Sequence, residues 1–440
     1  MNTDSAPVAK DPGFFRRALL TYQKETGQSL AMWTLIALLN FIAQIVFRRE
    51  LKPGEFGTLN TSLAIIGLMT VPVLALNQAC TTYLARHAAA GQSERIDLLR
   101  ATAPVVTEAF AWIWGALSLL LVFLFLSLLD LPRFSLQLFT LLNVLVALGG
   151  LVSWTVCQGG NRLRLWAWLL AASALTRVLV GAGLAWQEPW AESGLAAFLL
   201  AGLITLAPAL RSPETNTTTR LKAFRAMWSN LDHNFLLCTS ATFSVLLAFF
   251  LFSSADRIVA QSWFGVATNN NMGMVNWGLF DAYQTAGLLG RALLWGTQPL
   301  LWILFAQRSR LDRTNADSLT FFWIYLGALL AGAILLGCLA QPLSWLFCGP
   351  NFQPTSFFVP SFAVAMIPLG LLQALGIFSL ASRRYHECFV LGGCSVGYAL
   401  LLYLAGRQPQ LMPAYMFGGG LVSLMMVLFI GVVRWGRKQP

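Results

Sequence analysis

Long apolar runs follow one another along almost the whole chain, and they limit its possible folds more than any other feature. A helix needs about 20 mostly apolar residues to cross a bilayer, because each residue adds about 1.5 Å. The sequence therefore predicts an all-α polytopic membrane protein with about 12 transmembrane helices, in two six-helix lobes around a central cavity. The expected spans are 30–47, 57–84, 104–129, 134–157, 163–186, 194–210, 235–255, 276–305, 318–346, 357–380, 388–405 and 411–433.

The composition agrees with a membrane protein and excludes several other classes. The 440 residues are 57% hydrophobic and 11% charged, whereas soluble domains carry about 25% charged residues. The seven cysteines include no CxxC pair, and there are only three histidines. We therefore expect no disulfide framework, metal site or cofactor. The net charge of +11 does not indicate nucleic-acid binding, because the basic residues are distributed by membrane face.

That distribution predicts the orientation. With a cytoplasmic N-terminus, the cytoplasmic segments hold 21 Lys and Arg residues and the opposite face holds five. Positive residues collect on the cytoplasmic side of membrane proteins. The chain is thus expected to be a multi-pass protein of the inner (plasma) membrane with both termini in the cytoplasm. The expected organisation is a cytoplasmic segment (1–29), an N-terminal lobe (30–210), a cytoplasmic linker (211–234), a C-terminal lobe (235–433) and a cytoplasmic tail (434–440).

The two lobes carry a short internal echo. Arg49 precedes Gly57 by eight residues after the first span, and Arg257 precedes Gly265 by eight residues after the seventh. Six spans per repeat place both lobes the same way up in the membrane. This arrangement is typical of transporters built from parallel repeats.

A polar stripe marks the eighth span. Asp281, Gln284, Thr285, Arg291 and Gln298 recur at near-helical spacing, so they share one helix face. An arginine at the bilayer centre costs about 2.5–3.5 kcal/mol on insertion scales. Two interpretations remain open: the stripe faces a wet, substrate-lined cavity, or the arginine pairs with an acid on a neighbouring helix.

Other spans carry polar residues too. Arg177 is the second deeply placed arginine, and Asn40, Gln44 and Arg48 follow one face of the first span. Glu108 lies near the cytoplasmic end of the third span. The adjacent Asp256 and Arg257 close the seventh span and are expected to form an ion pair at the membrane interface.

Two mid-span arginines with few acids to balance them indicate an anionic ligand. The planar guanidinium suits phosphate oxygens, to which it donates two parallel hydrogen bonds. No glycine-rich phosphate-binding loop is present, which argues against ATP hydrolysis.

Three stretches resemble the MOP flippase superfamily, in particular the Wzx-type polysaccharide and O-antigen flippases. They are FRRELKPGEFGTLN (Phe47–Asn60), SADRIVAQSWFG (Ser254–Gly265) and LFCGPNF (Leu346–Phe352). With the twelve-span layout, the resemblance covers essentially the whole chain. The sequence departs from the family pattern at Trp263, where an acid or small residue is commoner, and in the asparagine-rich loop that follows.

The resemblance implies that the chain flips a lipid-linked oligosaccharide, of the undecaprenyl-pyrophosphate type, by alternating access. Arg177 and Arg291 would hold the pyrophosphate, and Arg48 or Arg49 would receive it nearer the outer face. The polar cavity lining would comprise Asn40, Gln44, Asp281, Gln284, Thr285 and Gln298. Asp281 and Glu108 are the candidates for coupling to a cation. The implied partners are the lipid-linked glycan, membrane lipids and a polysaccharide polymerase or export protein, with the flippase itself a monomer.

Other functions remain open. A MATE-like exporter or a peptidoglycan-precursor flippase would keep the fold and change the cargo. Cationic cargo predicts buried acids, which are scarce within the spans. A membrane glycan polymerase or transferase normally needs a large outer loop or paired acids, and neither occurs, so we do not expect an enzyme.

Overall fold

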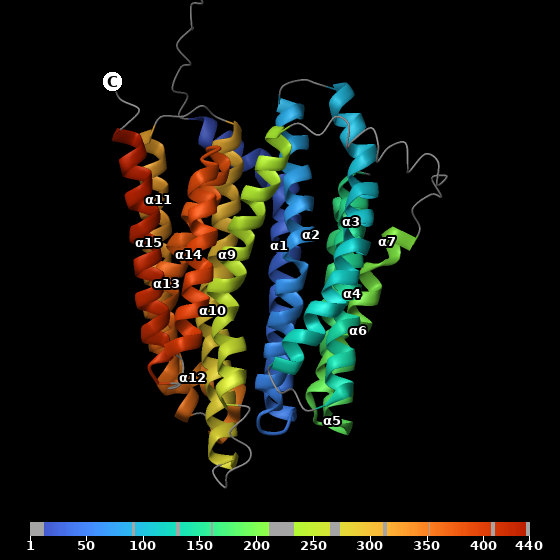
Figure 1. Cartoon of the computed structure of the whole chain (residues 1–440), viewed down its shortest axis with the longest axis vertical. Coiled ribbons are helices and arrows are strands. Elements are labelled where there is room, and N and C mark those ends of the chain that lie inside the picture. The colour runs from blue at the N-terminus through green and yellow to red at the C-terminus, as the bar shows by residue number, and fades with distance from the viewer. Residues whose placement is uncertain are drawn as a thin grey trace, which may run out of the picture.

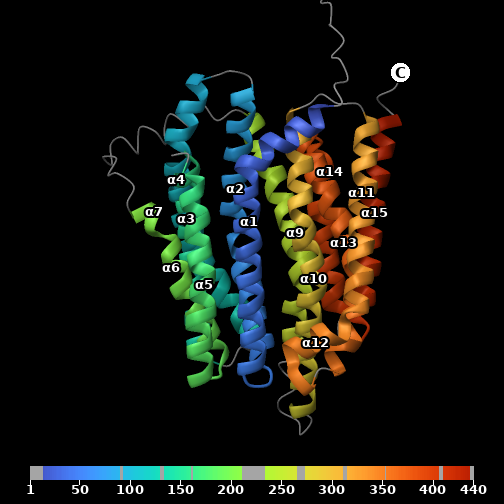
Figure 2. The same ribbon diagram turned by 180° about the vertical axis from the view of Figure 1, so that it is seen from behind.

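Two helical bundles lie side by side in the protein (Figure 1). The computed structural model describes residues 13–89, 93–128, 133–159, 162–210, 233–264, 273–310, 315–351, 353–405 and 410–436. In this part of the chain the secondary structure is helical, with no strand. Helices α1 and α2 of the first bundle face α9 and α10 of the second, and the view from behind shows the same arrangement (Figure 2).

We name the bundles by their order in the chain. The N-bundle contains α1 (Gly13–Glu50), α2 (Glu55–Ala89), α3 (Ser93–Leu128), α4 (Phe134–Gly159), α5 (Leu163–Gln187), α6 (Ala191–Thr205) and α7 (Ala207–Leu210). The C-bundle contains α9 (His233–Phe264), α10 (Gly273–Arg310), α11 (Asn315–Cys338), α12 (Ala340–Cys348), a 3₁₀ turn (Gly349–Asn351), α13 (Gln353–Ala381), α14 (Tyr385–Ala405) and α15 (Met412–Gly436).

Each of the twelve expected spans is helical, which confirms the fold class. Among the described residues, nine helices are long and apolar enough to cross a membrane, and a tenth is added if the bent pair α11–α12 counts as one span. The remaining two expected spans correspond to α6, a shorter apolar helix, and to α10, which carries the polar stripe. Tryptophans such as Trp112 and Trp186 are exposed on the outside, as expected for a surface that faces lipid.

One expected span is bent. The sequence predicts a single helix over 318–346, but α11 and α12 meet at an angle of 64°. Pro342 lies in the first turn of α12 and has no N–H to donate to the carbonyl of Cys338, the last residue of α11. The lost hydrogen bond explains why the helix breaks four residues before the proline.

The ends of the predicted organisation lie largely outside the described residues. This holds for 1–12, for 211–232, where the linker was expected, and for 437–440. Residues 13–29 form the first turns of α1 and continue directly into the first span.

The main seam between the bundles runs along α2 and α9 and is mostly apolar, with a hydrogen bond from the hydroxyl of Thr61 to the carbonyl of Arg257 at 3.3 Å. Gly67 of α2 brings the helices close, because a Cβ there would lie 2.7 Å from the ring of Phe250. Farther along the same seam, the rings of Tyr83 and Phe235 meet at 5.1 Å. At one end of the molecule, α1 also reaches α12 of the C-bundle (Figure 2). We call this end the α12 end, and the opposite end, where α1 begins and α15 ends, the terminal end.

Candidate functional site

Asp281 joins the two bundles at the α12 end. Its Oδ2 accepts a 2.8 Å hydrogen bond from the backbone N–H of Gly54, and its Oδ1 accepts a 2.9 Å bond from that of Gly57. Both donors lie at the start of α2, where N–H groups have no partner within the helix. Gly54 has φ of +87°, a left-handed conformation that favours glycine. The carboxylate of α10 thus caps a helix of the other bundle.

Arg48 adds a positive charge to this contact. Its Nε donates a 3.1 Å hydrogen bond to the hydroxyl of Thr285, and its Nη1 lies 3.5 Å from Oδ2 of Asp281. The Arg48 side chain is 16% exposed and that of Asp281 is 1% exposed. The predicted polar stripe of the eighth span therefore meets the predicted arginine of the first span.

Arg49 makes a second contact between the bundles at the same end. Its Nε donates to the carbonyl of Leu346 at 2.9 Å, and its Nη2 donates to that of Trp345 at 3.3 Å. The guanidinium also lies 5.8 Å from the centre of the Trp345 ring. These carbonyls belong to the last turn of α12, so the arginine caps the negative end of that helix.

Arg291 lies inside the C-bundle and is paired with an acid. Its Nη1 is 2.8 Å from Oδ2 and 3.1 Å from Oδ1 of Asp256, and both side chains are almost wholly buried. The hydroxyl of Tyr283 donates to the same carboxylate at 3.3 Å. The expectation of an interfacial Asp256–Arg257 pair is therefore wrong in its placement: α9 continues to Phe264, and Asp256 faces the bundle interior, where Arg291 is its partner.

Arg291 keeps donors that Asp256 does not use. Its Nε and Nη2 are buried without a hydrogen-bond partner in the described part of the chain. The guanidinium lies along its own helix against Gly287, where a Cβ would come within 2.7 Å of Nη2. A buried donor without a partner is costly, and Arg291 leaves two such donors among the described residues.

Arg177 lies in the N-bundle and has a different environment. Its Nη1 donates to Oδ1 of Asn40 at 2.9 Å, and its Nη2 donates to the hydroxyl of Ser173 at 3.3 Å. The guanidinium lies 4.8 Å from the ring centre of Phe198. Its Nε is buried and has no hydrogen-bond partner among the residues described. The described contacts do not bring Arg177 together with Arg291.

The other predicted residues are more dispersed. Oε1 of Gln44 is buried and has no partner within the described ranges, and Nε2 of Gln284 lies 3.5 Å from the carbonyl of Arg257. Glu108 is half-buried on α3. The side chain of Gln298 lies outside the described part. No group of three or more His, Cys, Asp or Glu residues that could hold a metal ion occurs in that part either.

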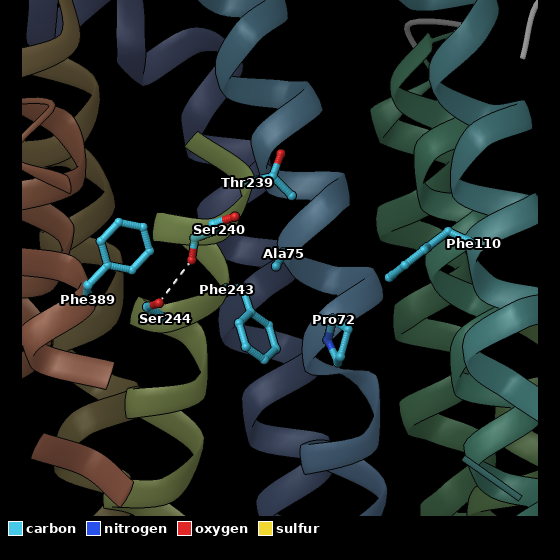
Figure 3. Close-up of a pocket in the computed structure, with 8 residues that line it drawn as sticks. All are labelled: Pro72, Ala75, Phe110, Thr239, Ser240, Phe243, Ser244 and Phe389. Carbon is cyan, nitrogen blue, oxygen red and sulfur yellow. Dashed lines mark hydrogen bonds between the residues drawn. The ribbon is translucent and has the colours of Figure 1, made fainter. Parts of the chain in front are cut away.

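A pocket of about 370 Å³ lies elsewhere, lined by residues of α2, α3, α9 and α14 (Figure 3). The hydroxyls of Thr239 and Ser244 donate to carbonyls of their own helix, at 2.9 and 3.0 Å. The pocket therefore offers mostly apolar walls and none of the predicted site residues. Its lining consists of Pro72, Ala75, Phe110, Thr239, Ser240, Phe243, Ser244 and Phe389.

Sequence reasoning missed two groups of this site. The first group is Asp256, for which the sequence indicates an ion pair with its chain neighbour Arg257. In the structure its partner is Arg291, which lies 35 residues later, on the next long helix of the same bundle. The second group is the pair of backbone N–H donors of Gly54 and Gly57. The sequence indicated them only indirectly, through the two glycines of the FRRELKPGEFG turn. A helix that begins just after a short turn always presents unpaired N–H groups, and that rule could have identified them.

Comparisons with known proteins agree on the architecture. No protein-family model matches the sequence, and no curated protein matches it significantly. The structure is similar to that of the lipid II flippase MurJ in an inward closed conformation, with a TM-score of 0.60 and 12% identity over 91% of this chain and 86% of that one. It is also similar to the eukaryotic MATE transporter AtDTX14, with a TM-score of 0.57 and 12% identity over 95% of this chain and 96% of that one.

A third similar structure is a MOP superfamily transporter from Pyrococcus furiosus, described as having a binding pocket of reverse polarity. Its TM-score is 0.51, with 15% identity over 92% of this chain and 93% of that one. At these identities the likeness concerns the fold. The chain is a multi-pass membrane protein with the fold of MOP superfamily transporters, and these structural neighbours are transporters and flippases rather than enzymes.

Proposed function

We propose that the protein flips a lipid-linked oligosaccharide, of the undecaprenyl-pyrophosphate type, from the inner to the outer leaflet of the plasma membrane for cell-surface polysaccharide biosynthesis. The observation that carries this proposal is the set of buried arginine donors inside the two helical bundles that lack a partner among the described residues. Nε of Arg177 and both Nε and Nη2 of Arg291 are buried and have no partner in the segments that the structure describes. A pyrophosphate offers acceptor oxygens of the charge and geometry that guanidinium groups bind.

The buried acids support an anionic cargo over a cationic one. Asp256 is paired with Arg291, and Asp281 is paired with Arg48. Each of these carboxylates is therefore already neutralised by an arginine of the protein. A cationic drug would have to displace an arginine from either carboxylate, whereas an anion can bind the remaining guanidinium donors directly.

In this proposal both termini are cytoplasmic, so that the α12 end faces the outside. The bundles would alternate between openings at the terminal end and at the α12 end. An inside-negative potential favours outward movement of an anion by about 2.3 kcal/mol per charge per 100 mV. The flippase would act as a monomer and pass its cargo to a polymerase or export protein.

A peptidoglycan-precursor flippase is the second candidate. The observation that favours it is the fold similarity to the lipid II flippase MurJ, at a TM-score of 0.60. Both candidates place a lipid-linked glycan in the same site, and they differ in the glycan. A direct comparison of cargoes separates them.

The test is a flipping assay in proteoliposomes. We expect the wild type to move a fluorescent undecaprenyl-pyrophosphate oligosaccharide to the outer leaflet, measured by access of an external quencher. Arg177→Ala should slow flipping about 10- to 100-fold, because it removes charge-assisted hydrogen bonds to the cargo. Arg384→Ala is the matched control. This arginine is 45% exposed, and its ion pair with Glu387 is long, at 3.5 Å. Exposed ion pairs of this kind contribute little, so its loss should change flipping little.

Three results would contradict the proposal or change the cargo. Equal flipping by wild type and Arg177→Ala, with both folded, would assign Arg177 to structure. Preference for lipid II in the same assay would favour the second candidate. Transport of an organic cation, with no movement of either glycolipid, would indicate a MATE-like exporter.

A further inference from the structure

Three charged side chains hold the two bundles together at the α12 end. Asp281 and Arg49 bind helix ends of the opposite bundle, and Arg48 binds the side chains of Thr285 and Asp281. We infer that Arg48, Arg49 and Asp281 form an inter-bundle latch, which keeps the α12 end closed and must open before cargo can leave there. The inference rests on the proposed function for its direction of transport. The latch itself follows from the contacts.

The first half of the latch is Asp281 at the start of α2. Both carboxylate oxygens are engaged, at 2.8 Å with the N–H of Gly54 and at 2.9 Å with that of Gly57. The N-terminus of a helix carries partial positive charge, so a carboxylate there is favourable. Arg48 contributes a full positive charge 3.5 Å away. Since Asp281 belongs to the C-bundle and the other groups to the N-bundle, this contact exists only while the α12 end is closed.

The second half has the opposite polarity. Arg49 of the N-bundle donates to the carbonyls of Trp345 and Leu346 in the last turn of α12. The C-terminus of a helix carries partial negative charge, which favours a cation. Each bundle thus supplies a charged side chain to a helix end of the other. Both contacts would be lost in one movement, because both lie at the same end of the interface.

The rest of the seam differs in chemistry. Between α2 and α9 a hydrogen bond crosses the seam, from the hydroxyl of Thr61 to the carbonyl of Arg257 at 3.3 Å. Elsewhere along these helices the contacts include apolar ones, such as Gly67 against Phe250 and Tyr83 against Phe235. Apolar contacts are not directional, so these surfaces can tilt against each other and remain in contact. The hydrogen bonds of the latch require fixed distances and angles. The apolar seam is therefore suited to be the hinge, and the latch is the part that breaks.

The experiment measures the opening at the α12 end directly. Spin labels are introduced as genetically encoded amino acids at Glu50 and Gln353, which leaves the native cysteines in place. Both positions are exposed, and they lie at the end of α1 and the start of α13. Pulsed electron paramagnetic resonance on the full chain in lipid nanodiscs then gives the distance distribution between the bundles.

We expect one short distance in the wild type. Asp281→Asn should increase the population of a longer distance about tenfold or more, because the amide loses the charge and one of the two acceptor oxygens. Arg49→Gln should shift the same equilibrium in the same direction, and this exposed position carries little risk of misfolding. Glu192→Gln is the matched control: Glu192 pairs with Arg133 at 3.1 Å at the same end but within the N-bundle, so the distance should not change.

Unchanged distances in both folded latch variants would overturn the inference. So would an equal shift in Glu192→Gln, since that result would attribute the opening to loss of charge in general. The outcome is independent of the cargo. A distance shift in a protein that flips no glycolipid would retain the latch and reject the proposed function, whereas normal flipping with unchanged distances would do the reverse.

Discussion

Replacing Asp256 with leucine should lower the free energy of unfolding by about 3–5 kcal/mol, because it leaves the charge of Arg291 buried without its carboxylate. Arg291 is 0% exposed, and among the described residues Nη1 is its one nitrogen with a hydrogen-bond partner, Asp256. Reversible unfolding in mixed micelles measures the change. If the free energy of unfolding of Asp256→Leu is within about 1 kcal/mol of the wild-type value, the expectation is wrong, because a loss that small is typical of a surface ion pair.

The double variant Asp256→Leu with Arg291→Met separates structure from transport. Replacing a buried ion pair with apolar residues of similar volume is often neutral or stabilising, so most of the lost stability should return. If Arg291 also binds the cargo, the stable double variant should still flip it at least about tenfold more slowly than the wild type does. Wild-type flipping by the stable double variant would show that Arg291 serves only the structure, and would leave the anion site to Arg177.

Gly57→Ala should force the α12 end open. A Cβ at this position would lie 2.0 Å from Cε1 of Phe280, a ring that is 1% exposed and has little room to move. Overpacking of this kind costs about 1–3 kcal/mol, and the cost applies only while α2 and α10 are in contact. The equilibrium should therefore shift toward the open α12 end by about 5- to 150-fold, measured by the same distance distribution between labels.

Two variants make this prediction specific. Gly278→Ala is the control. Gly278 lies on α10, less than one turn from Phe280, and a Cβ there would meet nothing within 4 Å, so the bundles should stay closed. Adding Phe280→Ala to Gly57→Ala removes the obstructing ring and should restore the short distance. Failure of this second change to restore closure would mean that Gly57 acts through something other than contact with Phe280.

Local patterns in the sequence predicted the helices but not every break in them. All twelve expected segments are helical, because long apolar runs in a membrane must satisfy their backbone groups internally. The break between α11 and α12 also had a local cause in Pro342. It was missed because the apolar run continues through the proline, so hydropathy alone shows no interruption.

The polar residues were found individually, whereas their grouping was not predictable. Asp281, Thr285 and Arg291 were expected to line one stripe, yet the structure divides them between the bundle interface and the interior of the C-bundle. Helical spacing gives the face of a residue on its own helix. It does not give the neighbour of that face, which depends on how helices pack.

The sequence by itself determined that this chain crosses the membrane many times, where the helices lie and which few charged residues fall within the long helices. These properties depend on hydropathy and on periodicity over neighbouring residues. Only the tertiary structure decided the partners of those charges: Arg291 with Asp256 across 35 positions, and Asp281 with the start of α2 across 227. A buried charge must be paired, but its partner is the group that packing brings within about 3 Å, and packing is a property of the whole chain.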